Sequence, residues 1–547
     1  MEPHISRRGF LRAAGGVAAV GATGVSLDAC SKSSSKNSAA VNEKVTLPAY
    51  ERYVGVTPDL PPTDAGVQPA FLRYPANPKA CTEGKPGSGG AVNVLFAIYG
   101  AVPPGLPGNK YWASLNSALG VDLKLQMILS GNMVEKLAVT LAGNDIPDIM
   151  QLWNQTPNTP PPNTPQMLAA KFQPLTEYLS GDAIKEYPLL ANLTQEQWKT
   201  TVYNGEIYGL PIPRERVGAL MYRREDIFKK LGVNPQPTSF AEFKDVCKQL
   251  TNAKSRRWAT ANWNGLINFI QAMLGAPNGW KEAGGKFTSE YEDPTYKQAL
   301  SDVRSMVSAG YLHPDAFEKN APVKDWLGAG TTPMGFDNYT AWPGYLTAYK
   351  AQFPEMNLNA MFPPNYDSSS KAVIRRGSPS YSTAIFKKAK PARIKELLRI
   401  ANYLASPFGT QEYLVRKYGA AGVDYNVKNG NVTLTAKGAA EALSGIGYIA
   451  DAPWAIYEPG HPEDTKKEHA YQVKAVPMTV ANPTIGLYSN TNSSQGAKLA
   501  VLITNAQQDI LQGRKPVSAW DGIMTQWRQQ GGDTIRKEFE QAFAKDK

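Results

Sequence analysis

The chain has 547 residues, of which 42% are hydrophobic and 19% charged, and its formal net charge is +11. This composition excludes a disordered chain, and the length exceeds what one hydrophobic core normally organises, so at least two folding units are expected. The basic residues are scattered among acidic ones without a long run, which favours a solvated surface over nucleic-acid binding.

The first thirty residues predict an export signal rather than folded structure. The pair Arg7-Arg8 precedes a weakly apolar run at 13–25 and the sequence Leu27-Asp28-Ala29-Cys30, which resembles a lipoprotein cleavage box. This order indicates that residues 1–29 are a Tat-type lipoprotein signal peptide. Lipid added at Cys30 would hold the protein on the outer face of the cell membrane. Plain signal cleavage, or no cleavage, stays open because Asp28 departs from the usual small or apolar residue.

Two extended segments follow the predicted signal. Residues 30–44 are rich in serine, which predicts a flexible tether. Residues 45–90 are rich in proline and glycine but also contain large apolar side chains such as Tyr53, Phe71 and Tyr74. A free linker rarely carries so many, so we expect a strap that packs on the surface of one lobe.

The folded body begins at Ala91 with alternating strands and helices. Apolar runs at 92–99, 121–129 and 148–152 predict strands, and helical spacing at 111–119 and 134–142 predicts the helices between them. This order favours a parallel sheet with crossover helices, and ligands of such sheets bind beyond the carboxyl ends of the strands. The rule points to Tyr99 and to the pair formed by Trp153 and Asn154.

Later segments predict further helices and one hairpin. Thr238 and Ser239 provide a hydroxyl cap before a helical run, and helical patterns recur at 391–404, 497–512 and 533–545. Asn429-Gly430 between two short β-like runs predicts a tight hairpin turn.

Sequence motifs for catalysis, cofactors or metals are absent. The chain has four histidines and lacks HExxH, GxSxG and a Walker loop, so we expect neither a cofactor nor a metal site. Besides Cys30 there are Cys81 and Cys247, for which two separate buried thiols are favoured over a disulfide. Two carboxylates that hydrolyse a glycoside need not be close in sequence, so an exported glycoside-active enzyme stays open.

Several segments resemble the extracellular solute-binding family of ABC importers, in particular its sugar-type, long oligosaccharide-binding lipoproteins. The resemblance spans about residues 45–547 and is specific through the order of its motifs. Its motifs are Lys136–Ile149, Gly205–Pro211, Leu220–Asp226, Ala405–Gly409 and Gly531–Asp533.

The resemblance implies an α/β fold of the periplasmic-binding-protein-like type II, with two discontinuous lobes joined by hinge crossings. The N-lobe would comprise 91–213 and 380–484, and the C-lobe 214–379 and 485–547. The crossings are expected near 211–220, 376–383 and 483–488. No bond is broken in such a protein: the lobes close on a ligand because contacts to it exist only in the shut state.

The resemblance also implies candidate ligand contacts and partners. Aromatic faces stack on sugar rings, and polar groups bind hydroxyls, although each aromatic residue has core packing as an equal alternative. Arg214 and Arg216 would hold an acidic sugar or pair with protein carboxylates. The expected partners are a carbohydrate and the transmembrane subunits of an ABC permease, with the protein acting as a monomer. A receptor for a non-sugar ligand is a further alternative. The remaining implied contacts are Trp153, Trp263, Asn264, Asp337, Asn338, Trp342 and Tyr381.

Overall fold

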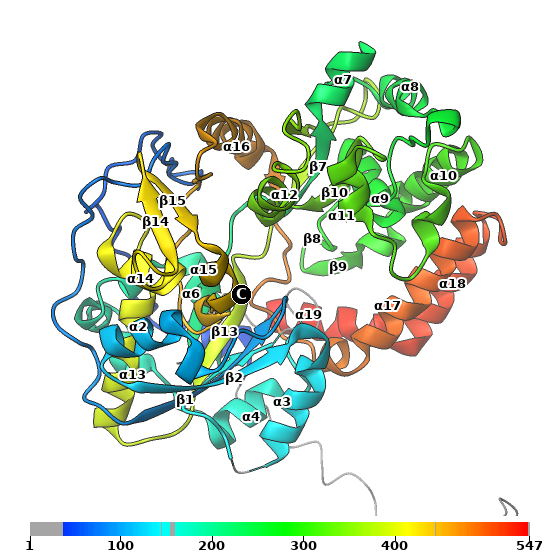
Figure 1. Ribbon diagram of the computed structural model, residues 1–547. Coiled ribbons are helices and arrows are strands. Elements are labelled where there is room, and N and C mark those ends of the chain that lie inside the picture. Colours follow the sequence, from blue (N-terminus) through cyan, green and yellow to red (C-terminus); the bar gives the residue numbers. More distant parts are fainter. Residues whose placement is uncertain (1–36, 144, 154–158, 444, 545–547) are drawn as a thin grey trace, which may run out of the picture.

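The computed structural model describes residues 37–143, 145–153, 159–443 and 445–544, which form two lobes, each built around its own sheet (Figure 1). The N-lobe sheet has the strand order β2-β1-β3-β13-β6, and the C-lobe sheet has the order β10-β7-β11. The predicted signal peptide and Cys30 lie outside the described residues. Among the helices of the described ranges, none combines the length and the apolar character that a membrane span requires.

The predicted parallel order of the first three strands is confirmed. β1 (Ala91–Ile98) pairs in parallel with both β2 (Asp122–Leu129) and β3 (Ile149–Leu152). The intervening helices are α2 (Lys110–Leu119) and α3 (Met133–Ala142), close to their predicted bounds. From Val94 to Ile98 every side chain of β1 is buried, as a strand covered on both faces requires.

Two strands from later in the chain complete the N-lobe sheet. β13 (Ser380–Phe386) lies antiparallel to β3, and β6 (Leu210–Pro213) lies antiparallel to β13. The hairpin predicted at Asn429-Gly430 is also confirmed, because both residues have positive φ between β14 and β15. The other N-lobe elements are α4 (Thr164–Lys171), α5 (Thr176–Leu179), α6 (Gln195–Lys199), β4 (Val202–Tyr203), β5 (Glu206–Ile207), α13 (Pro391–Leu404), α14 (Gln411–Tyr418), β14 (Tyr425–Lys428), β15 (Asn431–Leu434) and α15 (Ala436–Glu441).

The C-lobe surrounds its small sheet with helices and has a separate core. β10 (Met334–Asn338) and β11 (Leu358–Met361) both pair antiparallel with β7 (Ala219–Arg224). The terminal helices pack on this lobe, and the first of them begins seven residues before its predicted start. The other C-lobe elements are α7 (Glu225–Leu231), α8 (Phe240–Leu250), α9 (Trp263–Met273), β8 (Trp280–Ala283), β9 (Lys286–Ser289), α10 (Pro294–Ser308), α11 (Val323–Ala329), α12 (Trp342–Tyr349), β12 (Ile374–Arg375), β16 (Thr479–Val480), α17 (Asn490–Leu511), α18 (Ala519–Trp527) and α19 (Asp533–Ala544).

The first two crossings between the lobes run side by side as an antiparallel ribbon. The Arg214 amide donates to the Pro379 carbonyl over 3.0 Å, and the Gly377 amide donates to the Arg216 carbonyl over 2.8 Å. We call residues 214–218 and 375–379 the hinge ribbon. Gly218 and Gly377 lie so close across it that a Cβ on either would approach the opposite backbone to 3.2 Å or less.

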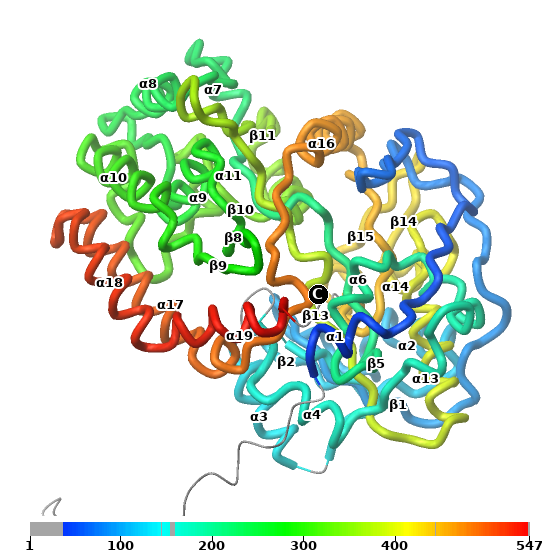
Figure 2. Tube along the Cα trace, turned by 180° about the vertical axis from the view of Figure 1, so that it is seen from behind, coloured from blue at the N-terminus to red at the C-terminus, as the bar shows by residue number. Residues whose placement is uncertain are grey.

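Residues 45–90, the strap, form no helix or strand and run over the N-lobe side of the molecule (blue in Figure 2). Phe71 and Tyr74 are buried in a small cluster with Phe408 and Tyr457 of the N-lobe. Val67 instead packs in a cluster of C-lobe residues, and the Gln68 amide donates to the Gln472 carboxamide over 2.9 Å. The strap therefore contacts both sides of the hinge rather than one lobe.

The flexible tether predicted for residues 30–44 is wrong for residues 37–44. A short helix, α1 (Ala39–Asn42), is capped by Ser38. The side chains of Asn37 and Asn42 accept hydrogen bonds from the amides of Asn204 and Gly205 over 2.9 and 2.8 Å. These local side-chain bonds fix a segment whose composition alone suggests freedom.

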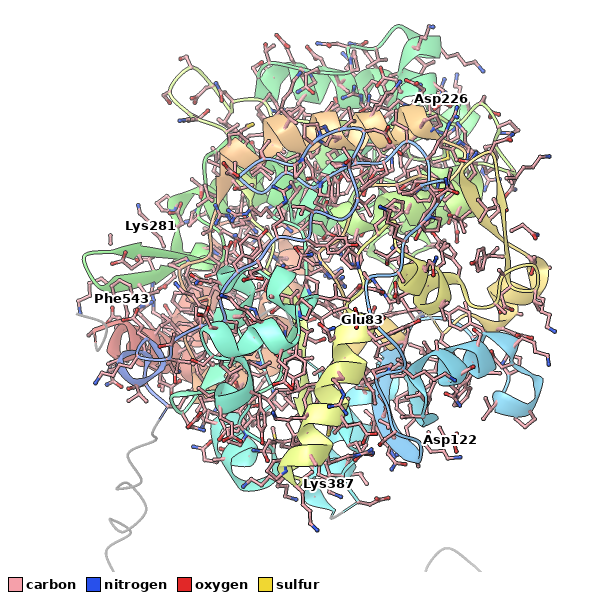
Figure 3. All side chains as sticks on the ribbon, turned by 90° about the vertical axis from the view of Figure 1, so that its left-hand side faces the viewer. Glu83, Asp122, Asp226, Lys281, Lys387 and Phe543 are labelled. Carbon is pink, nitrogen blue, oxygen red and sulfur yellow. The ribbon has the colours of Figure 1, made fainter. Side chains whose placement is uncertain are left out.

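The predicted N-lobe boundary at residue 484 also differs from the structure. α16 (Pro462–Ala475) packs on the C-lobe side, where Tyr471 stacks on Phe362 with ring centroids 4.6 Å apart. α16 buries the face that carries Tyr471 against the side of the C-lobe formed by β7 and β11. The chain therefore enters the C-lobe before residue 462, earlier than predicted. Side chains fill both lobes in Figure 3, where Asp122 begins the edge strand β2 of the N-lobe sheet, Lys387 follows the inner strand β13, and Asp226 lies at the far end of the C-lobe.

Candidate functional site

A cavity of about 560 Å³ lies between the lobes, directly against the hinge ribbon. We call it the cleft cavity. Its N-lobe wall comes from the carboxyl end of β3 and from β13, and its C-lobe wall from α9, β10 and β11. This is where ligands of parallel sheets bind, and the volume suits a small-molecule site.

Four aromatic rings form the N-lobe side of the site. Trp153 lies 5.9 Å from Tyr381 and 6.0 Å from Tyr99 between ring centroids, and Tyr448 lies within 6.2 Å of both tyrosines. Tyr99 is 58% exposed, so its ring is open to solvent at the carboxyl end of β1. Exposed aromatic faces beside polar groups are suited to the apolar faces of sugar rings.

Arg214 connects this aromatic group to the hinge ribbon. Its guanidinium lies 4.3 Å from the Tyr381 ring centroid and 4.9 Å from that of Trp454, close enough for cation–π attraction. The neighbouring Glu215 is 6% exposed, and burial raises its pKa to about 7 although Arg214 opposes the shift. The charge of Arg214 is therefore only partly balanced near neutral pH.

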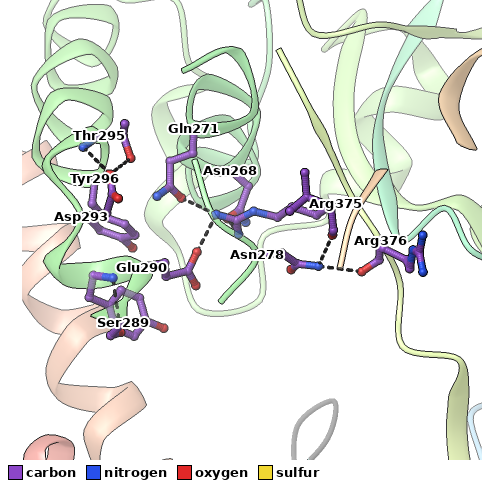
Figure 4. A network of polar contacts seen from close by, with 12 residues as sticks. Asn268, Gln271, Asn278, Ser289, Glu290, Asp293, Thr295, Tyr296, Arg375 and Arg376 are labelled. Carbon is purple, nitrogen blue, oxygen red and sulfur yellow. Dashed lines mark hydrogen bonds and ion pairs between the residues drawn. The ribbon is translucent and has the colours of Figure 1, made fainter. Parts of the chain in front are cut away.

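The C-lobe wall is organised by Arg375 (Figure 4). Its guanidinium donates to the side chains of Asn268 over 2.8 Å and Gln271 over 2.9 Å, and it pairs with Glu290 at 2.5 Å. Asn278 donates to the carbonyls of Arg376 and Val480, both over 2.9 Å. These bonds hold α9 against the ribbon and fix Asn268 and Asn278, two of the asparagines that line the cavity.

The structure brings together several of the predicted ligand contacts. Trp153, Arg214, Asn338 and Tyr381 line the cleft cavity, and Tyr99 lies beside them in the aromatic group. Asn154 lies outside the described residues. Arg216 faces a different cavity and pairs with Glu196 at 3.0 Å.

Trp342 is a core residue, which corrects its prediction as a ligand contact. Its side chain has no exposed surface and packs edge-on against Tyr222, with ring centroids 5.5 Å apart. Asp337 and Asn338 are adjacent in β10 and therefore point to opposite faces. Asn338 reaches the cavity, whereas Asp337 binds the Tyr345 hydroxyl at 2.9 Å and Lys324 at 3.1 Å.

Trp263 and Asn264 are not among the described residues that line the cleft cavity. Trp263 begins α9 and stacks on Phe317 with ring centroids 5.8 Å apart, while the side chain of Asn264 is exposed on that helix. Helix geometry instead directs Asn268 and Phe269, about one turn later, to the cavity.

Several cavity residues were missed by sequence reasoning. Arg375 and Arg376 stand directly before the glycine of the predicted second crossing, so their position at the hinge was a usable signal. Asn268 lies one helical turn after the predicted Asn264. Asn278 follows α9 in a loop, and only the tertiary contacts single it out.

In the described ranges, no three His, Cys, Asp or Glu residues are placed to hold a metal ion. Cys81 and Cys247 are free thiols; Cys247 is buried in the C-lobe core, while Cys81 belongs to the strap. Among the described residues that line the cleft cavity, Glu215 is the one carboxylate.

Comparison with known proteins gives a consistent picture. A family profile described as bacterial extracellular solute-binding protein matches residues 110–442. The polygalacturonan/rhamnogalacturonan-binding protein YtcQ of Bacillus subtilis is 24% identical over 492 residues, which cover 86% of this chain and 95% of that protein. Lipoprotein LipO of the same organism is 21% identical over 468 residues, covering 79% and 88%.

The fold is also that of solved solute-binding proteins. An HMO-binding, ABC-transporter-associated solute-binding protein from Bifidobacterium longum infantis superposes with a TM-score of 0.63 at 15% identity, covering 85% of this chain and 99% of that structure. The predicted two-lobed type II arrangement is therefore confirmed. In such a fold, the aromatic group, Arg214 and the asparagines face each other across a gap that lobe closure would narrow.

Proposed function

We propose, because the chain belongs to the bacterial extracellular solute-binding protein family, that its cleft captures an oligosaccharide by lobe closure and delivers it to an ABC importer. The proposal rests on the composition of the cleft cavity, whose lining includes the rings of Trp153 and Tyr381 and the amide side chains of Asn268 and Asn338. Aromatic faces and bidentate amide groups complement the apolar and hydroxyl surfaces of a sugar. The saccharide-binding relatives support the same ligand class.

The arginines of the cavity favour including acidic sugars among the candidate ligands. Arg375 is paired with Glu290 at 2.5 Å, so a protein carboxylate already compensates its charge, whereas Arg376 shares the Glu196 carboxylate with Arg216. Arg214 forms no ion pair among the described residues and lies beside the partly ionised Glu215, which leaves a positive charge available to a sugar carboxylate.

The cleft chemistry favours binding over glycoside hydrolysis. Hydrolysis requires an acid and a second carboxylate placed about 5–10 Å apart around the scissile bond. Glu215 alone among the described lining residues carries a carboxyl group, and it lies beside the arginine rather than opposite a second acid. Turnover of any bound oligosaccharide by the purified protein would contradict the proposal.

A thermal-shift screen followed by calorimetry tests this function. The panel contains neutral and uronate oligosaccharides, and a true ligand raises the melting temperature because it binds only the folded state. Tyr99→Ala should weaken the best ligand about three- to tenfold, since an aromatic contact contributes about 0.5–1.5 kcal/mol. Val501→Ala is the control, because Val501 is equally exposed at 58% on α17 of the C-lobe. The absence of any shift across the panel would refute saccharide binding.

We also propose that the mature protein is a monomer anchored outside the cell through lipid on Cys30 and docks on permease transmembrane subunits. The twin-arginine signal and the similarity to Lipoprotein LipO support this location. Metabolic labelling with a radioactive fatty acid should mark the protein and should fail for Cys30→Ser. Equal labelling of both would refute the anchor.

A further inference from the structure

A second cavity, of about 670 Å³, lies behind the hinge ribbon and beneath the strap. We call it the strap cavity. Strap residues from Tyr50 to Phe71 form one wall, and the start of α6, the segment around Trp454 and the hinge ribbon form the others. It is as large as the cleft cavity and falls in the range of small-molecule sites.

The strap cavity has an uncompensated positive charge. Arg216 from the first crossing and Arg376 from the second share one carboxylate, that of Glu196, at 3.0 and 3.2 Å. Two guanidinium groups on one carboxylate leave a surplus of one charge. Arg52 of the strap adds another positive charge and forms no ion pair within the described part of the chain. The acid on the strap side of the cavity is the exposed Asp64.

The remaining wall suits a flat polar ligand. Tyr53 and Trp454 bring aromatic rings, and one face of Trp454 lies under the Arg214 guanidinium at 4.9 Å. Glu215 also lines this cavity, and its raised pKa makes it a weak counter-charge near neutral pH. Arginine forks bind carboxylates bidentately, and aromatic faces accept pyranose rings.

The two cavities are separated by backbone. The hydrogen bonds between Arg214 and Pro379 and between Gly377 and Arg216 close the ribbon that forms the common wall. A ligand in the strap cavity would therefore be a second molecule rather than the end of a chain held in the cleft.

We propose that the strap cavity is a second binding site, which takes a saccharide that carries a carboxylate. The proposal goes beyond the cleft function and does not depend on it.

Hydrogen exchange read by mass spectrometry on the full chain tests the proposal, with trigalacturonate and neutral galactotriose as probes. Trigalacturonate should slow exchange in residues 50–69, and galactotriose should not. Arg52→Gln and Arg216→Gln should each raise the half-saturating concentration about tenfold or more, as expected for the loss of a charge-assisted bond. Arg514→Gln is the matched control, since Arg514 pairs with Asp509 on the far lobe. The cleft variant Asn268→Ala should leave the strap response unchanged.

Two outcomes would overturn the proposal while leaving the cleft function intact. In one, trigalacturonate protects α9 but not residues 50–69. In the other, the strap response shifts with Asn268→Ala and not with Arg52→Gln, which means that it reports only lobe closure. Protection of the strap without protection of α9 by any saccharide would instead support the second site and refute the cleft function.

Discussion

At the scale of single residues, burial separates side chains that have the same chemistry. Trp153 follows β3 and lies in the aromatic group of the cleft, whereas Trp342 is enclosed by Tyr222 and its neighbours. The indole nitrogen of Trp342 has no hydrogen-bond partner in the described structure. Its contribution is therefore apolar packing in the C-lobe core.

Trp342→Ala tests this assignment. The substitution should lower the free energy of unfolding by about 3–5 kcal/mol, because it removes a large buried side chain and leaves a cavity. Chemical denaturation measures the loss. Tyr99→Ala serves as the opposite case, with nearly unchanged stability and weaker ligand binding. If Trp342→Ala kept its full stability but bound the ligand more weakly, Trp342 would be a ligand contact after all.

At the scale of elements, buried carboxyl groups attach the strap and α16 to the body. Glu412 of α14 accepts bonds from the amides of Cys81 and Thr82, each over 3.0 Å. Glu396 of α13 accepts bonds from the Ser88 amide and hydroxyl over 2.9 and 2.7 Å. Burial alone would raise the pKa of both glutamates, but these hydrogen bonds outweigh it and lower them.

Glu412→Gln should loosen the strap and cost about 1–3 kcal/mol, the range for hydrogen bonds to a charged group. Amide exchange in residues 78–90 should accelerate. Because the folded-state pKa is lowered, the stabilisation is present above the ordinary carboxyl pKa and is lost as the pH falls. Glu463→Gln is the control, since Glu463 is exposed and pairs only with Lys466. Unchanged exchange in the strap at neutral pH would contradict this attachment.

At α16, the pKa values of Glu458 and Glu468 shift in the opposite direction, upward. Glu458 lies just before the helix and Glu468 within it, and both are almost fully buried with Tyr339 and Asp464 nearby. Burial raises the pKa of Glu458 to about 8 and that of Glu468 well above its ordinary value. Asp464 is paired with Lys467 at 2.8 Å and adds to the negative field. The folded state is therefore more stable when these two glutamates are protonated than when they are ionised.

The stability of the protein should fall as the pH rises from the ordinary carboxyl pKa of 4.5 through about 8. Glu458→Gln imitates the protonated acid, so it should be more stable than the parent at pH 8.5, where ionisation of the buried Glu458 costs free energy in the folded state. At pH 4 the two proteins should unfold alike. Thermal unfolding across pH 4–9 measures the difference, and parallel curves would refute the raised pKa of Glu458.

At the scale of the whole molecule, the hinge ribbon is the only element that borders both cavities in the described structure. Its two strands come from crossings more than 150 residues apart, and glycines at 218 and 377 permit their close approach. The strap and α16 span the same region from outside. Motion of the lobes is therefore expected to involve all three elements.

Small-angle scattering should record this motion. Saturation with the best oligosaccharide should reduce the radius of gyration, because the two lobes approach when the ligand contacts both. Asn268→Ala should require more ligand for the same change. Scattering curves that coincide at saturating ligand would exclude closure as the binding mechanism.

Much of the N-lobe could be predicted because its signals are local. Apolar runs and helical spacing at 92–152 correspond to β1, α2, β2, α3 and β3 within two residues. The candidate site was less accessible, since Asp337 and Asn338 share a motif but point to opposite faces. Asn278 carries no pattern of its own and is defined by two backbone carbonyls from distant segments.

The sequence by itself determined the two-lobed α/β type and the parallel strand order, because hydrophobic periodicity and motif order are properties of neighbouring residues. Only the tertiary structure decided which tryptophan is core, where α16 packs, and that Arg214 and Arg376 line both cavities while Arg216 lines the strap cavity alone. These outcomes depend on contacts between segments that are distant in the sequence, such as Tyr222 with Trp342 and Phe362 with Tyr471, and such contacts leave no periodic trace in the chain.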